Sequence, residues 1–145
     1  MARGRGVRPD GRSKVEPYVR LPHWLLDCPA FLSLRPLPRA LLLLLARRFN
    51  GRNNGRIGLG EREAARDLSM SDRAAVRRGF IELQERGFIT CAREAGFAMK
   101  VGYRRAKEWT LAWLPVGDVS ASKAFMRWRP PAGEIGGAGN LSRPG

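Results

Sequence analysis

Two short helical patterns lie next to each other between residues 60 and 87, and only the tripeptide SMS separates them. The first, GEREAARDL, collects its small and apolar residues on one face and places two glutamates at the positive end of the helix dipole. The second repeats apolar residues at Val76, Phe80 and Leu83, a spacing that aligns them on one inward face. Two short helices joined by a three- to four-residue turn form a helix-turn-helix, whose second helix fits the major groove of duplex DNA.

The second of these helices is predicted to span residues 71–86. Ser71 or Asp72 can cap its free backbone N–H groups, and Gly87 ends it. Its outer face mixes cations with small or apolar residues, which permits close approach to base edges. The outer-face residues are Asp72, Arg73, Ala74, Arg77, Arg78 and Ile81. We expect base contacts from Arg73, Ala74 and Arg77, and contacts to the DNA backbone from Arg66, Ser71 and Arg78. The alternative is that these charged side chains only form a solvated, exposed face of the helix.

Strand-like patterns lie on both sides of the helical pair. Residues 56–59 precede it, and residues 88–92 and 108–114 follow it, with a Gly-containing loop over 94–105. This arrangement predicts a hairpin that joins the first strand in a three-stranded sheet against the helices. The loop would then form a basic wing over DNA phosphates or the minor groove, although charges in a loop can also serve solubility alone. The predicted wing cations are Lys100, Arg104 and Arg105.

A leucine-rich pattern over residues 33–50 predicts the longest helix, with Pro36 and Pro38 in its opening turn, where a missing N–H does little harm. Leu42 and Leu43 widen its apolar face beyond one stripe, so the helix must be buried on more than one side. It is therefore either the central core helix or also a contact surface for a second copy of the chain, which leaves a homodimer open. Before it, residues 18–31 suggest one short helix and a turn.

The stretch LSMSDRAAVRRGFIELQERGFI, residues 68–89, resembles the recognition-helix and first wing-strand region of MarR-like and GntR-like winged helix-turn-helix proteins. The residues that carry the match are Leu83, Gly87, Phe88 and Ile89. The resemblance implies an α+β, mainly α fold, with a three-helix core and a two- to three-stranded wing sheet. Residues 21–59 are also similar to helix-turn-helix proteins of phage, plasmid or alphaproteobacterial origin, some of them linked to replication initiation.

Composition divides the chain into three parts. Residues 1–16 are expected to be a disordered basic arm, residues 17–116 the winged helix-turn-helix domain, and residues 117–145 a disordered tail. The arm would add contacts to the DNA backbone through Arg3, Arg5, Arg8 and Arg12. Within the tail, the motif FMRWRPP at residues 125–131 is predicted to be a docking segment for a protein partner.

The charge of the chain favours a nucleic-acid partner. It carries 27 basic and 13 acidic residues, a formal net charge of +14, and such a polycation attracts polyanions such as double-stranded DNA. Arginine far outnumbers lysine, so a GC-rich coding sequence can account for part of the bias. No apolar run is long enough to span a membrane, and the basic N-terminus lacks a secretory signal, so we expect a cytoplasmic, nucleoid-associated protein.

The sequence offers no enzyme chemistry. It contains no nucleophile with an adjacent base, no paired carboxylates and no phosphate-binding loop, so neither an enzymatic activity nor a cofactor is expected. Cys28 and Cys91 lack metal-ligand spacing, and His23 is the single histidine. We therefore expect no metal site, two cysteines that act as small buried hydrophobes, and a structural role for the histidine.

The function expected from the sequence is sequence-specific binding of duplex DNA by a transcriptional regulator. Two alternatives remain open. One is a phage- or plasmid-type replication-initiation or accessory factor, which the same domain could serve. The other is a winged-helix adaptor that binds proteins.

Overall fold

The computed structural model describes residues 16–93, 96–98 and 103–132. This part of the chain is an α+β, mainly helical structure with five α-helices and a small three-stranded antiparallel sheet. The elements in chain order are α1 (His23–Leu26), α2 (Pro29–Leu32), α3 (Pro36–Arg48), β1 (Ile57–Gly58), α4 (Glu61–Asp67), α5 (Arg73–Glu85), β2 (Ile89–Arg93), β3 (Gly96–Ala98), β4 (Tyr103–Arg105), β5 (Glu108–Leu111) and the short 3₁₀ helix η1 (Ala124–Arg127).

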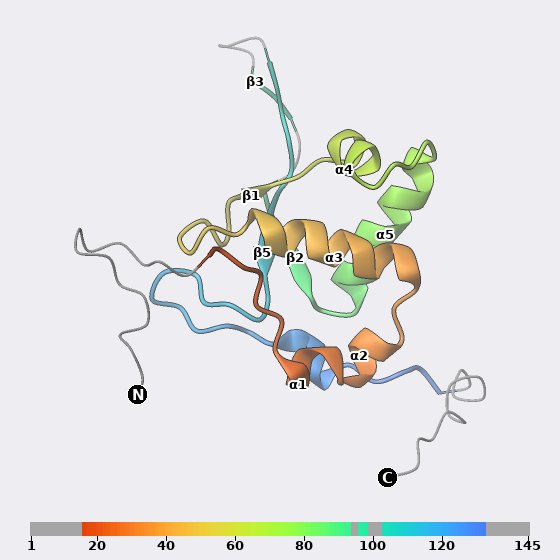
Figure 1. The fold of residues 1–145 in the computed structure, drawn as a ribbon, viewed down its shortest axis with the longest axis vertical. Coiled ribbons are helices and arrows are strands. Elements are labelled where there is room, and N and C mark those ends of the chain that lie inside the picture. Colours follow the sequence, from red (N-terminus) through yellow and green to blue (C-terminus); the bar gives the residue numbers. More distant parts are fainter. Residues whose placement is uncertain (1–15, 94–95, 99–102, 133–145) are drawn as a thin grey trace.

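Helix α3 lies at the centre of the fold (Figure 1). Leu41, Leu42 and Leu45 are all buried, as the wide apolar pattern predicted, but the prediction is wrong for Leu43, which is 51% exposed. Helix α5 packs closely on α3 because Gly79 has no side chain: a Cβ there would lie 2.7 Å from Cδ2 of Leu37. This close packing fixes the position of α5 in the molecule.

The three-stranded sheet has the order β1-β5-β2, and both pairings are antiparallel. Trp109 in the central strand is fully buried, and its ring stacks on that of Phe80 in α5 with 4.9 Å between ring centroids. Its indole N–H donates a hydrogen bond to the carbonyl of Leu59 at 2.9 Å. The predicted three-stranded sheet is confirmed, although β5 ends at Leu111 instead of Leu114 because residues 112–113 form a turn.

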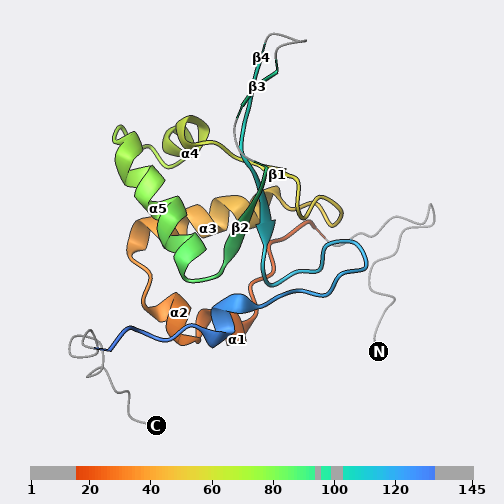
Figure 2. The ribbon, with the colours of Figure 1, turned by 180° about the vertical axis from the view of Figure 1, so that it is seen from behind.

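Beyond this sheet, β3 and β4 pair as a second antiparallel hairpin, with Gly96 opposite Arg105 and Ala98 opposite Tyr103. The sequence predicted a loop over residues 94–105, and this is corrected: Arg104 and Arg105 belong to a strand. This paired hairpin projects away from the body of the molecule (Figures 1 and 2). Lys100 lies outside the described residues.

The N-terminal segment forms two short helices, α1 and α2, where the sequence suggested one helix and a turn. The second helix begins at Pro29, a residue suited to the first helical position because its missing N–H needs no partner there. Together with η1, these helices lie at the end of the molecule opposite the projecting hairpin (Figure 2). Of the helices in the described ranges, none has the length and apolar character needed to cross a membrane.

The expected boundary at residue 116, with a disordered tail after it, is wrong for residues 117–132. This segment returns to the domain, and Phe125 is fully buried there. The Phe125 ring stacks on Phe88 with 4.6 Å between centroids and lies parallel to Trp24 at 6.0 Å. The aromatic side chain supplies the apolar contact area that a free tail would lack. Residues 133–145 lie outside the described part of the chain.

The FMRWRPP motif therefore contacts its own domain. In addition to Phe125, the partly buried Met126 and Trp128 pack against the core, and the guanidinium of Arg86 lies over the Trp128 ring at 4.6 Å. The largest side chains of the segment that was predicted to dock on a protein partner thus pack against this chain itself.

Candidate nucleic-acid interface

Helices α4 and α5 are joined by residues 68–72, and local hydrogen bonds define this connection. Ser69 adopts a left-handed conformation with φ of 56°, and the N–H of Met70 donates to the carbonyl of Ala65 at 2.8 Å. The carboxylate of Asp72 accepts a hydrogen bond from the N–H of Ala75 at 3.1 Å, so Asp72 caps α5. Of the two caps that the sequence offered, this is the one used, and Ser71 lies exposed just before it.

Helix α4 is held in place by ion pairs to α3. The Arg48 guanidinium lies 3.2 Å from the carboxylate of Glu63 and 2.8 Å from that of Asp67. Ala64 and Ala65 form the buried side of α4. Both helices of the pair are therefore positioned by α3: α4 through these ion pairs, and α5 through its close packing at Gly79.

The two faces of α5 divide as the sequence predicted. Val76, Phe80 and Leu83 are buried. The residues expected on the outer face are all exposed: Asp72, Arg73, Ala74, Arg77, Arg78 and Ile81. Helix α4, the first turns of α5 and the β3–β4 hairpin lie toward the same end of the molecule (Figures 1 and 2). A long ligand on that end could contact both the helical pair and the hairpin.

The two arginines expected to contact bases differ in their surroundings. Arg73 is exposed, and no described residue accepts a hydrogen bond or ion pair from it. Arg77 is held by Glu61 at the start of α4: its Nε lies 3.3 and 3.2 Å from the two carboxylate oxygens, and its Nη2 lies 3.2 Å from Oε1. The hydrogen bonds and charge of Glu61 raise the pKa of Arg77 above its ordinary value. As in other arginines, the guanidinium is charged at any working pH.

The residues expected to contact the DNA backbone are less uniform. Arg66 is exposed on α4, and Arg78 is exposed on α5 with its Nη2 3.9 Å from Asp72. Arg104 and Arg105 fall in β4, in the projecting hairpin. Lys100 and the arm arginines Arg3, Arg5, Arg8 and Arg12 lie outside the described residues.

Charge is distributed unevenly between the helical pair and its flanks. Residues 61–86, which include α4 and α5, contain six arginines and six acidic residues, so their formal charges cancel. Residues 93–107, which span the hairpin, contain five basic residues and one acidic residue. Any long-range attraction for a polyanion would therefore come from the hairpin and the other basic segments, and not from the formally neutral helical pair.

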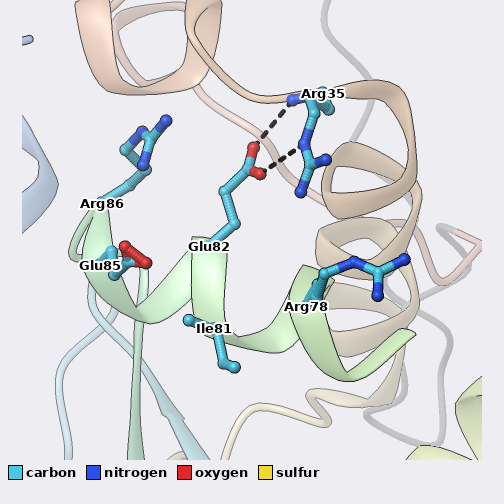
Figure 3. A pocket seen from close by; sticks show the side chains of 6 residues that line it. All are labelled: Arg35, Arg78, Ile81, Glu82, Glu85 and Arg86. Atoms are coloured by element: carbon cyan, nitrogen blue, oxygen red, sulfur yellow. Dashed lines mark hydrogen bonds and ion pairs between the residues drawn. The ribbon is translucent and has the colours of Figure 1, made fainter. Parts of the chain in front are cut away.

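An open pocket of about 270 Å³ lies between the start of α3 and the outer side of α5. Its lining residues are Arg35, Arg78, Ile81, Glu82, Glu85 and Arg86. Figure 3 shows the carboxylate of Glu82 directed at Arg35, which donates to it from its backbone N–H at 2.9 Å and from Nε at 2.8 Å. Each oxygen of this mostly buried carboxylate thus accepts one hydrogen bond from Arg35, and the ion pair joins α5 to the start of α3.

Sequence reasoning missed the roles of Glu61 and Glu82. Glu61 was assigned only to the helix dipole, and Glu82 lay between two residues of the apolar stripe. One signal was present for Glu61: acids and arginines are equal in number over residues 61–86, which favours ion pairs within that segment. It does not apply to Glu82, whose partner Arg35 lies outside the segment. The sequence could not say which acid meets which arginine, because the pairs join residues 16 and 47 positions apart.

No group of three or more histidine, cysteine, aspartate or glutamate residues suited to a metal ion occurs within the described ranges. Cys28 is buried, and its thiol donates to the carbonyl of Leu25 at 3.1 Å, while Cys91 is half-buried in β2. His23 lies exposed at the start of α1. Comparison with protein-family models, with curated proteins and with solved structures found no match to this chain.

Proposed function

We propose that this chain is a winged helix-turn-helix protein that binds specific sites on double-stranded DNA and regulates transcription. In this proposal α5 enters the major groove, while the β3–β4 hairpin and the arm of residues 1–16 contact the DNA backbone. The observation that carries the proposal is the position of an exposed arginine-bearing face on α5 at the same end of the molecule as a projecting basic hairpin.

The dimensions of the elements support this arrangement. Helix α5 has 13 residues, which at about 1.5 Å per residue gives a rod of roughly 20 Å. A major groove about 12 Å wide accepts such a helix side-on or by its first turns. The β3–β4 hairpin lies in the chain between β2 and β5, the two strands that pair after α5, and this is where the proposal requires a wing.

The charge distribution supports a division of roles. A nearly neutral helical pair gives little non-specific attraction, so its contacts depend on the bases that it meets. The basic hairpin gives affinity that is independent of sequence and sensitive to salt. This combination suits a protein that must find particular sites among many competing ones.

The test uses the purified full-length chain and two DNA probes: a random-sequence duplex and a duplex site selected from a randomised library. Arg77→Ala should abolish the preference for the selected site, and Arg104→Ala should weaken binding to both duplexes alike. Equal loss with both variants on both probes would contradict the assignment of base and backbone contacts. Absence of binding by the wild-type chain to either probe at moderate salt would contradict DNA binding itself.

Library selection also tests symmetry. If the chain binds as a homodimer, the selected site should be a palindrome with half-sites about 34–36 Å apart, one turn of the double helix. A single asymmetric site would indicate a monomer. Fragments selected from the genome of the source would separate a transcriptional role from a replication role by their position.

A protein-binding adaptor is the second candidate, and the formal neutrality of residues 61–86 favours it over a purely electrostatic DNA binder. An adaptor would not discriminate between DNA sequences. It would therefore give no enriched motif in the library selection, and Arg73→Ala and Arg77→Ala would leave any residual DNA binding unchanged.

A further inference from the structure

The contact between Glu61 and Arg77 engages one particular edge of the guanidinium. Nε and Nη2 form one side of this planar group, and both face the Glu61 carboxylate at 3.2–3.3 Å. A guanidinium has five N–H bonds in a fixed fork. Two of them point at the carboxylate, so three remain: both on Nη1 and one on Nη2. No other described residue accepts a hydrogen bond from Arg77.

The remaining N–H groups form the outer end of the side chain. One on Nη1 and one on Nη2 lie parallel, which is the arrangement that binds O6 and N7 of a guanine in the major groove. The Arg77 side chain is 57% exposed and the Glu61 side chain only 23%. The carboxylate is thus the more enclosed partner, and the outer edge of the guanidinium is the part that a ligand can reach.

This contact also separates Arg77 from its neighbours. Arg73 has no acceptor among the described residues, and Arg78 lies at the longer distance of 3.9 Å from an exposed Asp72. A long, flexible side chain loses conformational freedom when it binds a base, and a fixed partner removes part of that loss beforehand. The formal charge of the pair is zero, so the pair adds orientation to DNA binding and little counterion release.

We propose that Glu61 is a positioning residue that holds the Arg77 guanidinium with its outer edge directed at a guanine in the major groove. This inference rests on the proposed function, because it requires α5 to lie in that groove. It makes guanine the base selected by this part of α5 and makes α4, through Glu61, a determinant of sequence preference.

The test compares variants by selection from a randomised duplex library and by affinity for a random-sequence duplex. Wild type should enrich guanine at one position, and Arg77→Ala should lower this preference by about 5- to 150-fold, the range of one bidentate arginine–guanine contact. Glu61→Gln should reduce the preference by about fivefold, because the neutral amide holds the guanidinium less firmly. Its affinity for the random duplex should rise, since a negative charge near the DNA is removed.

Glu63→Gln is the matched control. Glu63 lies in the same first turn of α4 and carries the same charge, but it contacts Arg48, which keeps its shorter ion pair with Asp67 at 2.8 Å when Glu63 is replaced. This variant should change random-duplex affinity in the same direction and leave the guanine preference at the wild-type value. The double variant Glu61→Gln/Arg77→Ala should show the same preference as Arg77→Ala alone, because a positioning residue acts only through its partner.

Arg77→Lys is a second variant that keeps the charge and loses the two-edged geometry. It should keep most of the random-duplex affinity and lose the guanine preference, a result that a merely structural role of the pair would not produce. The inference is overturned if Glu61→Gln keeps the wild-type guanine preference. It is also overturned if this variant sharpens the preference, because Glu61 would then keep Arg77 away from the DNA. Failure of the wild-type chain to bind any duplex would overturn both this inference and the proposed function.

Discussion

Asn54 is a buried polar side chain that ties the turn before β1 to the end of β5. Its Nδ2 donates to the carbonyls of Leu111, Leu114 and Pro115 at 3.0, 3.0 and 3.2 Å. Its Oδ1 accepts from the N–H of Leu111 at 2.7 Å. In the sequence this asparagine is one of two in a turn-forming GRNNG segment, and nothing there distinguishes it from Asn53. The distinction arises because only Asn54 faces the sheet.

Asn54→Asp tests this hub with almost no change in volume. The introduced carboxylate would face carbonyl oxygens in a buried site, so we expect the free energy of unfolding to fall by about 3 kcal/mol at neutral pH. This loss of stability should shrink as pH falls toward about 3.9, the ordinary pKa of an aspartate. The reason is that the buried carboxyl binds a proton more readily in the folded state than in the unfolded state. Urea unfolding at several pH values measures both effects.

Asn50→Asp is the control for this change. The Oδ1 of Asn50 is exposed and accepts from the N–H groups of Arg52 and Asn53, and a carboxylate can do the same. Its effect should stay within about 0.5 kcal/mol. Similar effects of the two substitutions would show that Asn54 is not the hub described.

Gly87 links α5 to β2 at a position that excludes any side chain. Its φ is +87°, and a Cβ there would lie 2.8 Å from the backbone nitrogen of Phe125. Gly51 also has a positive φ, +97°, but open space around it. Gly87→Ala should therefore destabilise the chain by about 2–4 kcal/mol and Gly51→Ala by only about 1 kcal/mol, the backbone strain alone. Thermal or urea unfolding of both variants measures the difference, and equal values would mean that the segment around Phe125 does not press on Gly87.

The elements of this fold are held together largely by contacts between their side chains, because several are too short to be stable alone. Helices α1, α2 and η1 each have four residues. They share an aromatic cluster in which Phe125 stacks on Phe88, and Phe31 meets Phe88 edge-on at 6.3 Å. The C-terminal segment thus belongs to the folded unit through η1, and β2 and α5 depend on it where Gly87 approaches Phe125.

Phe125→Ala tests whether η1 is part of that unit. Removing a fully buried phenylalanine should lower the free energy of unfolding by about 3–5 kcal/mol. Val119→Ala is the control in the same segment, since Val119 is 69% exposed, and should change it by less than about 0.5 kcal/mol. Tryptophan fluorescence during urea unfolding follows both. A small effect of Phe125→Ala would indicate that residues 117–132 are only a loosely attached tail.

For the molecule as a whole, the net charge of +14 is not spread evenly. Residues 61–86 are formally neutral, whereas the hairpin segment 93–107 carries five basic residues and one acidic residue, and the arm of residues 1–16 carries five basic and two acidic residues. The proposed binding mode therefore assigns affinity for DNA and preference for a site to different parts of the chain. Salt should affect the first far more than the second.

The salt dependence of DNA binding tests this distribution. If about five phosphates are neutralised, log affinity against log salt should have a slope of about −4 to −5. Replacing the four arm arginines Arg3, Arg5, Arg8 and Arg12 by alanine should make the slope shallower by up to about 3 to 4. Arg66→Ala on α4 should change it by at most about 1. Filter-binding titrations between low and moderate salt give the slopes. An unchanged slope in the arm variant would show that the arm does not contact the DNA.

Local patterns in the sequence were sufficient to predict α3, α4, α5 and the strands β1, β2 and β5, but not the paired strands β3 and β4, where a loop was predicted. The predictions succeeded because a helix of period 3.6 and a strand of period 2 must each bury one face, and that requirement is written in neighbouring residues. The same reasoning predicted which side of α5 is exposed. Capping was predicted as a choice between Ser71 and Asp72, and both residues have the chemistry for it.

The tertiary structure alone decided the contacts between distant residues. These include the Glu61–Arg77 and Arg35–Glu82 ion pairs, the hydrogen bonds of Asn54 and the burial of Phe125. The physical reason is that a charged, amide or aromatic side chain can be satisfied by water or by many partners, so composition does not select one. Only when the backbone elements pack do particular atoms come within bonding distance. Packing made an expected tail part of the domain and gave one of several exposed arginines, Arg77, an acidic partner in Glu61.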